Sequence, residues 1–598
     1  MSSAMEKLEQ WLEMDMWGPT KEEAQELKNK KNMAAIESQF GKRIAFGTAG
    51  LRGPMKTGWA CMNDLTVIQA SQGLAKYLEA QNGTTDFRVV IGHDSRHNSR
   101  RFARRAATAF LSLGAEVILF SDVVPTPMIP FAVSHHKCAA GIMVTASHNP
   151  KQDNGYKVYW SNGAQIIPPH DAGIAKSIDA HSNPWASAWD EQIAEKSERC
   201  HCTLAETSAA YFKAITANSF LDADVPRDGI TFTYTAMHGV GWKYCQRAFE
   251  AFGLPRFCDV EKQVSPDPEF PTVEYPNPEE GKGALTLAIE TAEANNSSVI
   301  LANDPDADRL AVACKHDGQW QILNGNQIGS LLGWWVFTNY VKRNPECKKD
   351  DLYMVASTVS SKMLGTMAAA EGFNFVETLT GFKWMGNKAR DLQQEGKTVL
   401  FSFEEAIGFC IGTTVVDKDG VNASAVMAEL CLYLAAQGKT LVDCLNDLYT
   451  KYGYHCTFNS YYICGEQATI DAIFSRIRHY DGGDASGAVV YPSVVADVQV
   501  LSVRDVTLGT DSAQPDGKCL LPQQSGHMVT FKFANDCVLT LRTSGTEPKI
   551  KFYSEIKAPM PSDGVTTPVE NELETFVTKV VNDLLQPDVH NLQAKKSA

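Results

Sequence analysis

Three aspartates alternate with other residues in the segment DPDADR, as Asp304, Asp306 and Asp308. An extended segment would project all three carboxylates to one side. Carboxylates that close repel one another unless a cation lies among them, and hard oxygen ligands favour Mg²⁺ or Ca²⁺. An EF-hand loop is excluded, because its glycine and its later glutamate do not fall in place. The segment predicts a Mg²⁺ site with positions left for a phosphate, and a solvated acidic turn is the alternative.

A serine, Ser147, lies in the polar segment TASHNP directly after the apolar run GIMV. A serine hydroxyl is a poor nucleophile unless a base, a metal or an activated leaving group assists it. His148 is adjacent in the sequence, but neighbouring side chains often point apart. Taken alone, the segment is an ordinary turn more readily than a catalytic one, so Ser147 becomes a candidate only together with the other motifs.

The segment RTSGTEPKIK, residues 542–551, combines an arginine, three hydroxyls, a glycine and two lysines. Arginine suits bidentate phosphate recognition, and hydroxyls with loop N–H groups complete anion sites. The segment therefore favours an anion site over a solvated loop. It is not a Walker A loop, because the pattern G-x-x-x-x-G-K-[ST] is absent.

Two neighbouring glutamates, Glu404 and Glu405, follow another apolar run. Paired carboxylates bind sugar hydroxyls or work as an acid and a base, as in glycosidases. Since sequence neighbours are not thereby placed across a scissile bond, sugar binding is the favoured interpretation.

The bulk composition describes a large packed protein. Its 598 residues are too many for one hydrophobic core and indicate roughly three to five domains. A net charge of −15 argues against a nucleic-acid footprint, which needs a basic patch. A local cluster of arginines, interpreted as a solvated helix face rather than a ligand site, comprises Arg96, Arg100, Arg101, Arg104 and Arg105.

Cysteine spacing and apolar runs bear on the location of the chain. The fifteen cysteines include only one close pair, Cys200 and Cys202, with no C-x-x-C or metal-knuckle spacing, which is typical of a reduced chain. The N-terminal segment carries charges throughout and shows no apolar core of a signal peptide. The longest apolar run, near 328–337, is far shorter than the ~20 residues that span a bilayer. We expect a cytoplasmic protein that does not contact a membrane.

Several short apolar runs lead directly into polar loops, namely 88–92, 141–144, 298–302 and 398–401. Helical spacing of apolar residues recurs between them, for example at 67–78 and 426–434. Alternation of strand, loop and helix predicts α/β layers, in which loops at the carboxyl ends of strands line the crevice. We predict a composite active site and four domains, 1–206, 207–324, 325–453 and 454–598.

The motifs together resemble the α-D-phosphohexomutase superfamily over residues 47–551. TASHNP resembles its phosphoserine loop, DPDADR its metal loop, FEEAIGF its sugar-binding loop and RTSGTEPKIK its phosphate-binding loop, in the same order and with matching spacing. SHNPKQDNGYKVYW, GFKWMGN and DKDG further resemble the eukaryotic branch of phosphoglucomutase-type and phosphopentomutase enzymes, which includes a bisphosphate-synthase relative. The resemblance implies a four-domain, heart-shaped architecture around one cleft, with three related α/β domains and a smaller α+β C-terminal domain, each supplying one loop.

The resemblance also implies roles for individual residues. Phospho-Ser147 would donate the phosphoryl group and complete the coordination of a Mg²⁺ held by Asp304, Asp306 and Asp308. Arg52 and Lys157 would face the reacting phosphate. Lys418 and His148 are candidates for general acid/base work or phosphate orientation. The implied ligand contacts are Arg309, Thr380, Gly381, Lys383 and Glu404, and for the second phosphate Arg542, Ser544, Gly545 and Thr546, with Lys549 and Lys551 nearby.

The implied activity interconverts sugar 1-phosphates with 6- or 5-phosphates through a bisphosphate intermediate, with glucose 1,6-bisphosphate or a related sugar bisphosphate as activator. We expect a monomer whose partners are small sugar phosphates. Ala406 stands where many hexomutases have serine. Loss of a hydrogen bond to a ring hydroxyl relaxes the discrimination between sugars, so both hexose and pentose phosphates are candidate substrates. A glucose 1,6-bisphosphate synthase that uses another phosphoryl donor is the close alternative. A non-catalytic sensor and a phosphatase with an aspartate nucleophile are more distant ones.

Overall fold

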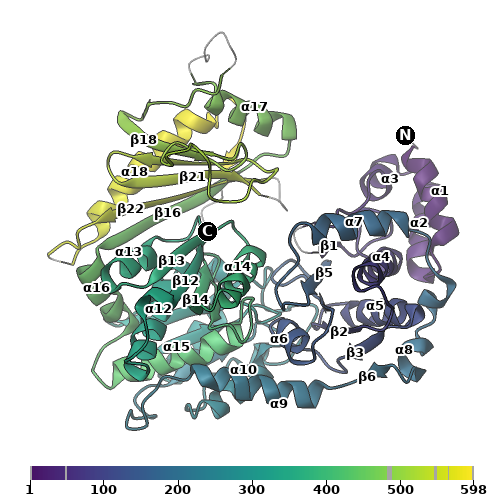
Figure 1. Ribbon diagram of the computed structural model, residues 1–598, viewed down its shortest axis with the longest axis horizontal. Helices are drawn as coiled ribbons and strands as arrows, with labels where there is room; N and C mark the ends of the chain where they lie inside the picture. Colours follow the sequence, from purple (N-terminus) through teal and green to yellow (C-terminus); the bar gives the residue numbers. More distant parts are fainter. Residues whose placement is uncertain (1–2, 48–49, 481–487, 545–548, 563, 595–598) are drawn as a thin grey trace. The chain divides into compact units, whose positions relative to one another are not determined.

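The computed structural model describes residues 3–47, 50–480, 488–544, 549–562 and 564–594. The chain forms two compact units, Met1–Val355 with Gly381–Leu441 and Ala356–Thr380 with Val442–Ala598. Each unit consists of sheets covered by helices, which Figure 1 traces along the chain.

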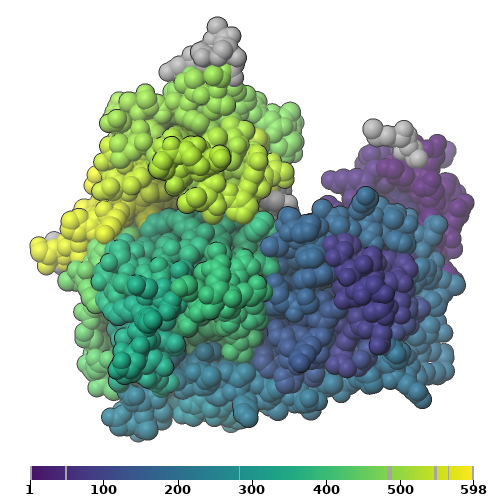
Figure 2. Space-filling view, in the orientation of Figure 1, coloured from purple at the N-terminus to yellow at the C-terminus, as the bar shows by residue number. Residues whose placement is uncertain are grey.

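The first unit begins with a cluster of helices, α1 (Ala4–Met14), α2 (Gly18–Lys30) and α3 (Met33–Phe40). Ser3 and Glu6 form a capping box at the start of α1, which satisfies N–H groups that the helix leaves unpaired. Trp11 and Phe40 are fully buried between the helices. Figure 2 shows the cluster in purple against the blue segments that follow.

A mixed sheet follows in the order β1-β5-β4-β2-β3-β6. Its strands are β1 (Gly50–Pro54), β2 (Arg88–His93), β3 (Glu116–Leu119), β4 (Ala140–Val144), β5 (Asp153–Trp160) and β6 (Cys200–His201). β2 runs parallel to β3 and β4, and β3 to β6, whereas β5 is antiparallel to β1 and β4. Strands β2 and β4 are buried along almost their whole length, as their continuous apolar sequences require.

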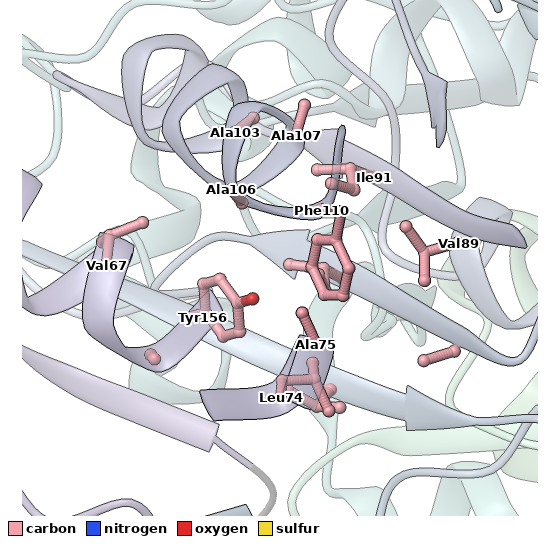
Figure 3. Packing of buried hydrophobic residues seen from close by; sticks show 14 of the residues in the cluster. Val67, Leu74, Ala75, Val89, Ile91, Ala103, Ala106, Ala107, Phe110 and Tyr156 are labelled. Atoms are coloured by element: carbon pink, nitrogen blue, oxygen red, sulfur yellow. The ribbon is translucent and has the colours of Figure 1, made fainter. Parts of the chain in front are cut away.

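Helices cover this sheet and close its core. They include α4 (Asp64–Asn82), α5 (Ser99–Leu113), α6 (Met128–His135) and α7 (His170–Ala180). Figure 3 shows Val67 and Leu74 of α4 and Phe110 of α5 packed with Tyr156 of β5. The predicted helical segment 67–78 lies inside α4 and is confirmed.

A second sheet in the order β11-β10-β9-β7-β8 follows the connecting helix α9 (Leu204–Ile215). Its strands are β7 (Phe232–Thr235), β8 (Cys258–Asp259), β9 (Val299–Ala302), β10 (Ala311–His316) and β11 (Gln319–Leu323), with helices α10 (Gly241–Ala251) and α11 (Lys282–Ala294). The loop after β9 carries the three aspartates. A Cβ at Gly239 would lie 2.3 Å from Pro305 Cα, so only glycine lets the backbone before α10 approach this loop.

The rest of the first unit contains a hairpin between helices. The elements are α12 (Gly325–Arg343), α14 (Phe382–Gln394), β14 (Thr398–Glu404), β15 (Gly408–Ile411) and α15 (Gly420–Ala435). β14 and β15 pair antiparallel with Glu404 opposite Gly408, which leaves residues 405–407 as the turn. The predicted helical segment 426–434 lies in α15 and is confirmed. Strand β12 (Leu352–Ser357) crosses the limit between the two units.

The second unit combines α13 (Met363–Glu371) and β13 (Asn374–Thr378) with the C-terminal part of the chain. The latter forms a sheet in the order β17-β18-β20-β21-β22-β16-β23, with β19 beside β18. Its elements are α16 (Leu441–Tyr452), β16 (Tyr454–Ile463), α17 (Gln467–Arg478), β17 (Val494–Val495), β18 (Val498–Asp505), β19 (Thr510–Asp511), β20 (Met528–Phe533), β21 (Cys537–Thr543), β22 (Lys549–Ala558), α18 (Thr567–Leu585) and β23 (Gln593–Ala594). The strand pairs described in this sheet are antiparallel, unlike the parallel pairs found in the first two sheets.

The expected α/β fold class is confirmed by these sheets and their covering helices. Residue 206 lies inside α9, residue 324 directly before α12, and residue 453 directly after α16. Domain limits at these positions stay predictions. Within the described residues, no helix has the length and apolar character needed to cross a membrane.

Candidate active site

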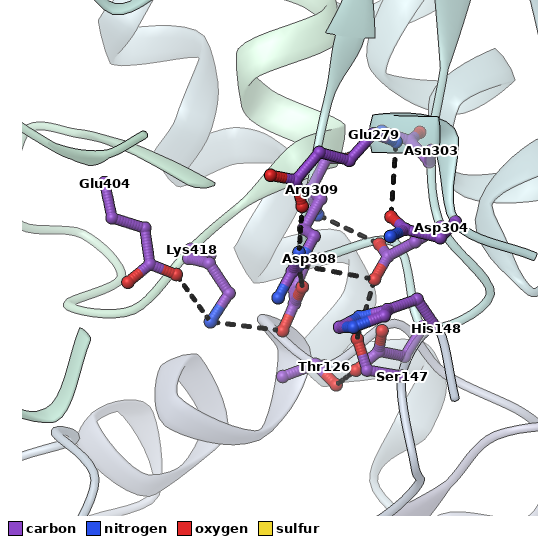
Figure 4. Close-up of polar contacts among 12 residues, drawn as sticks. Thr126, Ser147, His148, Glu279, Asn303, Asp304, Asp308, Arg309, Glu404 and Lys418 are labelled. Carbon is purple, nitrogen blue, oxygen red and sulfur yellow. Dashed lines mark hydrogen bonds and ion pairs between the residues drawn. The ribbon is translucent and has the colours of Figure 1, made fainter. Parts of the chain in front are cut away.

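Ser147 lies in the loop that leaves β4. Its φ of 52° is in the left-handed region, which non-glycine residues adopt rarely and which clusters at functional sites. Thr145 Oγ1 accepts a hydrogen bond from the Ser147 N–H at 2.9 Å and donates one to Asp94 Oδ2 at 2.7 Å, which holds the turn. Ser147 Oγ donates to Asp304 Oδ2 at 2.7 Å (Figure 4). The loop of the predicted carrier serine therefore meets the predicted metal loop.

Arg96 fastens the serine loop to the first sheet. Its guanidinium donates to the carbonyl oxygens of Ser147 and Asn149, both at 2.5 Å, and to that of Pro150 at 2.8 Å. Its Nε lies 3.4 Å from Asp94 Oδ2, and only 3% of the residue is exposed. One buried arginine thus holds the backbone of the loop on the side away from solvent.

The interpretation of the arginine cluster as a solvated helix face is wrong for most of its members. Arg96 precedes α5, which begins at Ser99. Arg105 is buried, and its Nε and that of Arg101 lie 3.0 and 3.1 Å from Oδ1 of the buried Asp64. Charge spacing alone did not reveal that one face of α5 packs on a buried carboxylate.

The aspartate loop is a tight turn rather than the extended segment expected from the sequence. The Ala307 N–H donates to the Asp304 carbonyl oxygen at 2.8 Å, and Ala307 has a φ of 51°. The turn still brings the carboxylates together, because one oxygen from each of Asp304, Asp306 and Asp308 lies within 4.8 Å of the others. All three side chains are buried.

Burial and neighbouring charges shift the pKa values of Asp304 and Asp306 in opposite directions. Burial, together with the neighbouring carboxylates, raises the pKa of Asp304 well above its usual value. Burial acts on Asp306 in the same direction, but the ammonium of Lys157 at 2.7 Å outweighs it and holds the pKa of Asp306 below its usual value. Lys157 Nζ also lies 3.0 Å from Asp308 Oδ2.

The aspartate cluster fits a hard divalent cation. Its donors are all carboxylate oxygens, the set that Mg²⁺ prefers. Among the described residues, Asp306 Oδ1 is a buried oxygen without a hydrogen-bond partner, and Asp308 Oδ1 also lacks a hydrogen bond and has Arg309 Nε 3.9 Å away. A buried, unpartnered carboxylate oxygen is costly unless a cation compensates it. The residues present therefore match a metal ion.

Lys418 lies in the DKDG segment between β15 and α15, surrounded by carboxylates. Its Nζ is 3.5 Å from Asp308 Oδ2 and 3.9 Å from Glu404 Oε1 (Figure 4). It also lies 3.7 Å from Asp417 Oδ1. Burial opposes the charged ammonium, but the three carboxylates outweigh burial and raise the pKa of Lys418 above its usual value. Lys418 is therefore protonated and can donate hydrogen bonds. Its ammonium lies between Asp308 of the loop after β9 and Glu404 at the end of β14.

His148 points toward Ser147, with Nδ1 3.3 Å from Ser147 Oγ. Burial, followed by the guanidinium groups of Arg309 and Arg52, holds the pKa of His148 well below its usual value. A neutral imidazole at this distance is able to accept a proton from a hydroxyl. Arg52, in β1, donates to Asn149 Oδ1 at 3.2 Å and so belongs to the same loop environment.

The turn of the β14–β15 hairpin is tied to the aspartate loop. The Leu310 N–H donates to the Ile407 carbonyl oxygen at 3.1 Å, and Arg309 pairs with Gly408 in an isolated bridge. Ala406 is half-buried in this turn. Arg309 Nε lies 3.9 Å from both Asp304 Oδ2 and Asp308 Oδ1. Arg309, Glu404 and Ala406 thus lie in the same region as Ser147.

The remaining predicted ligand residues divide between the units. In the first unit, Gly381 has a φ of 100° at the start of α14, which carries Lys383. In the second unit, Arg542 Nη1 donates to Thr380 Oγ1, and the Ser544 N–H donates to the Lys549 carbonyl oxygen at 2.9 Å. Lys551 lies two residues further along β22. Gly545 and Thr546 lie outside the described residues, so the predicted phosphate loop is seen only at its two ends.

Sequence reasoning missed residues that support the site without belonging to its motifs. Asp94 accepts from Thr145 and pairs with Arg96, and Thr126 donates to Asp306 Oδ2 at 2.6 Å. Asp94 follows an apolar run in the segment HDSRHNS, which was a usable signal. Thr126 had none, because its partner lies 180 residues away in the sequence.

Comparison with known proteins identifies the class. The α/β/α domains I, II and III of the phosphoglucomutase/phosphomannomutase family match residues 43–185, 209–318 and 324–452. The putative phosphomannomutase of Thermus thermophilus shares the fold, with a TM-score of 0.63 at 22% identity over 90% of this chain and 99% of that one. Parafusin of Paramecium, a phosphoglucomutase, does so with a TM-score of 0.66 at 16% identity over 92% of this chain and 96% of that one.

Closer relatives narrow the branch. The phosphopentomutase of Mus musculus is 49% identical over 98% of this chain and 95% of its own length. Glucose 1,6-bisphosphate synthase of Homo sapiens is 44% identical over 98% of this chain and 94% of its own length. Phosphoribomutase of Saccharomyces cerevisiae is 39% identical over 98% of this chain and 97% of its own length. The chain therefore belongs to the eukaryotic branch of the α-D-phosphohexomutase superfamily and is a phosphomutase, an isomerase. The predicted architecture of three α/β domains followed by a β-rich C-terminal domain is confirmed.

Proposed function

We propose that this phosphomutase is Mg²⁺-dependent and moves a phosphoryl group between O1 and O5 of ribose or deoxyribose phosphates, and between O1 and O6 of glucose phosphates, through phospho-Ser147. The observation that carries the proposal is the 2.7 Å hydrogen bond between Ser147 Oγ and Asp304 Oδ2, inside a cluster of three buried aspartates. The identity to phosphopentomutases supports the pentose substrates. Ala406 is compatible with the acceptance of glucose phosphates and pentose phosphates together. The serine hydroxyl that many hexomutases carry at this position is absent, so it cannot select one sugar ring over the other.

The reaction runs in two halves. First, the substrate's free hydroxyl oxygen attacks the phosphorus of phospho-Ser147 and gives its proton to a base, while the bond from phosphorus to Ser147 Oγ breaks and that oxygen takes up a proton. The product is a sugar bisphosphate. After the bisphosphate turns around, its other phosphoryl group returns to Ser147 and the isomeric monophosphate leaves. Because each cycle consumes and restores phospho-Ser147, a sugar bisphosphate such as glucose 1,6-bisphosphate primes an unphosphorylated chain.

The residues near Ser147 divide the work of the transfer. Asp304, Asp306 and Asp308 would hold Mg²⁺, which as a Lewis acid stabilises charge on the phosphoryl oxygens. Neutral His148 is placed to take or return a proton at Ser147 Oγ, 3.3 Å away. Lys418, whose carboxylate neighbours hold its proton tightly, donates hydrogen bonds to the phosphoryl oxygens and stabilises negative charge.

Ligand orientation is assigned to further cationic and polar residues. Arg52 and Lys157 orient the reacting phosphate. The sugar ring is assigned to Glu404, Arg309, Thr380, Gly381 and Lys383. A mutase needs a second anion site, because the bisphosphate carries a phosphate at each end. We assign the second phosphate to Arg542, Ser544, Gly545 and Thr546, with Lys549 and Lys551 nearby. The contact between Arg542 and Thr380 supports this assignment.

A glucose 1,6-bisphosphate synthase is the second candidate, favoured by 44% identity to the human enzyme of that name. It would use the same serine and metal loop, with a different phosphoryl donor.

Product analysis separates these reactions. Purified protein is incubated with Mg²⁺ and with ribose 1-phosphate, deoxyribose 1-phosphate or glucose 1-phosphate, primed with glucose 1,6-bisphosphate or given 1,3-bisphosphoglycerate. Our proposal predicts 5-phosphates and glucose 6-phosphate with priming alone. Turnover that needs 1,3-bisphosphoglycerate and accumulates bisphosphate would establish the synthase instead. Ser147→Ala should abolish turnover, and Ser112→Ala, which removes a buried hydroxyl in α5, should not. An active Ser147→Ala variant would favour an aspartate nucleophile.

Three other expectations stay predictions: the cytoplasmic location, the monomeric state and the absence of nucleic-acid binding. We retain the domain limits 1–206, 207–324, 325–453 and 454–598 as part of the proposal.

A further inference from the structure

Thr126 holds the metal loop at two points. It lies in the segment between β3 and α6, and its side chain is fully buried. Its N–H donates to the Asp306 carbonyl oxygen at 2.9 Å, and its Oγ1 donates to Asp306 Oδ2 at 2.6 Å. One residue of the serine-bearing domain thus fixes both the backbone and the carboxylate of one aspartate.

The segment that carries Thr126 is itself anchored on both sides. The Val124 N–H donates to the His93 carbonyl oxygen at 3.0 Å, which ties the segment to the end of β2. The Tyr244 hydroxyl of α10 donates to the Val123 carbonyl oxygen at 3.3 Å, which ties it to the domain of the metal loop. The segment therefore has little freedom to move relative to either side.

The pairing of β2 with β4 connects the segment of Thr126 to the loop of Ser147. His93 lies opposite Val144 in the parallel pairing of β2 with β4, and the Ser147 loop begins directly after Val144. The spacing between the serine loop and the aspartate loop is thus set partly through His93 and Thr126. Ser147 and Asp304 meet at 2.7 Å only if this spacing holds.

The hydrogen bonds at Asp306 also select which of its oxygens faces the other ligands. Oδ2 accepts from both Thr126 Oγ1 and Lys157 Nζ, at 2.6 and 2.7 Å. Oδ1 is a buried atom without a hydrogen-bond partner among the described residues. Two donors on Oδ2 fix the carboxylate plane and leave Oδ1 for the cation. Groups that orient a metal ligand in this way usually matter to metal affinity nearly as much as the ligands do.

We propose that Thr126 is a positioning residue for the metal centre: its hydroxyl orients Asp306, and its N–H sets the aspartate loop against the Ser147 loop. The proposal rests on the proposed function in taking Asp304, Asp306 and Asp308 as metal ligands.

The test measures metal binding without substrate. Thr126→Val keeps the shape and the N–H but removes the hydroxyl, and Thr126→Ser keeps the hydroxyl. Mn²⁺, a spectroscopic substitute for Mg²⁺, is titrated into each chain and the free ion is followed by electron paramagnetic resonance. We expect Thr126→Val to weaken Mn²⁺ binding about 10–100-fold and Thr126→Ser to retain wild-type affinity. The Mg²⁺ concentration for half-maximal activity should rise equally, with the KM for sugar phosphate unchanged.

A matched control separates positioning from general loss of a buried hydroxyl. Thr108, fully buried in α5, donates through Oγ1 to the Arg104 carbonyl oxygen at 2.9 Å, so Thr108→Val removes a comparable bond away from the site. Thr126→Val that binds Mn²⁺ as tightly as Thr108→Val would overturn the proposal. Unfolding curves recorded in a chelator should coincide for the two variants, and a deficit confined to Thr126→Val would show a structural role instead. Should Thr126→Val fail to fold, Thr126→Ala, which also keeps the N–H, decides.

The two proposals fail separately. If the wild-type chain binds Mn²⁺ but converts no sugar phosphate, the proposed function fails and the positioning role of Thr126 is still measured. If Thr126→Val binds metal normally in an active mutase, only the positioning role fails.

Discussion

Arg96→Ala should loosen the loop of Ser147 while leaving the rest of the first sheet intact. The guanidinium donates to carbonyl oxygens of the loop and lies 3.4 Å from Asp94 Oδ2. Its removal leaves Asp94, which is 2% exposed, without its cation. Breaking a buried pair from one side costs about 3–5 kcal/mol, and the carbonyl oxygens lose their charged donor as well.

Hydrogen exchange measures this loss where it occurs. A local cost of about 3–5 kcal/mol corresponds to roughly 10²- to 4 × 10³-fold faster exchange of the amides at 145–153, since each 1.4 kcal/mol is tenfold. Ser147 would also leave its left-handed conformation, and misplacing a reacting group by about 1 Å can slow transfer roughly 10²-fold. We expect a matching fall in the rate at which glucose 1,6-bisphosphate phosphorylates Ser147.

Arg100→Ala is the matched control, because Arg100 belongs to the same arginine cluster but is exposed. It should change neither loop exchange nor phosphorylation. If Arg96→Ala and Arg100→Ala behave alike in both measurements, Arg96 does not hold the loop and the reasoning from its buried contacts is refuted.

Three further variants test other parts of the site and the fold. Lys418→Met should lower kcat about 10²–10³-fold, as loss of a charge-stabilising donor does, with little change in the exchange of the Ser147 loop; a smaller loss in steady-state assays would exclude that role. Ala406→Ser should raise the ratio of kcat/KM for glucose 1-phosphate over ribose 1-phosphate about 2- to 10-fold, the value of one hydrogen bond, and an unchanged ratio would remove Ala406 from sugar selection. Burial opposes the charge of Glu377, but Lys362 and Arg504 lower its pKa to about 2, so its contribution to stability is present above pH 4.5 and is lost as the pH falls toward 2. Urea unfolding of the second unit should therefore show roughly 2 kcal/mol less stability at pH 3 than at pH 7 in the wild type, and Glu377→Gln should lack that component.

The sequence predicted the strands that carry the site because short apolar runs ending in polar loops are a local pattern. The runs before Ser147 and Asp304 became β4 and β9, and both loops lie where α/β sheets place their active sites. The alternation of the aspartates predicted that their carboxylates lie close together, which is confirmed, but it did not predict the conformation, since the segment forms a turn. The three carboxylates converge because the segment turns, and the alternation of aspartates with other residues does not predict that turn.

The residues that sequence reasoning missed or misjudged act over long separations. Arg96 looked like one more surface charge, yet its carbonyl partners lie more than 50 residues further along the chain. Lys418 became a candidate only through the family resemblance, because a lone lysine has no pattern. Its partners Asp308 and Glu404 lie in two other segments that only the fold brings close to it. Packing between distant segments decides these roles.

The central claim is that Ser147 carries the phosphoryl group, and a discharge experiment tests it most directly. The chain is phosphorylated with glucose 1,6-bisphosphate, freed of excess donor and analysed by peptide mass spectrometry before and after addition of ribose 5-phosphate. We predict that phosphate is found on Ser147 and is lost from it as ribose 1,5-bisphosphate forms in equal amount. Phosphate on another residue, or its release as inorganic phosphate without bisphosphate formation, would contradict the claim.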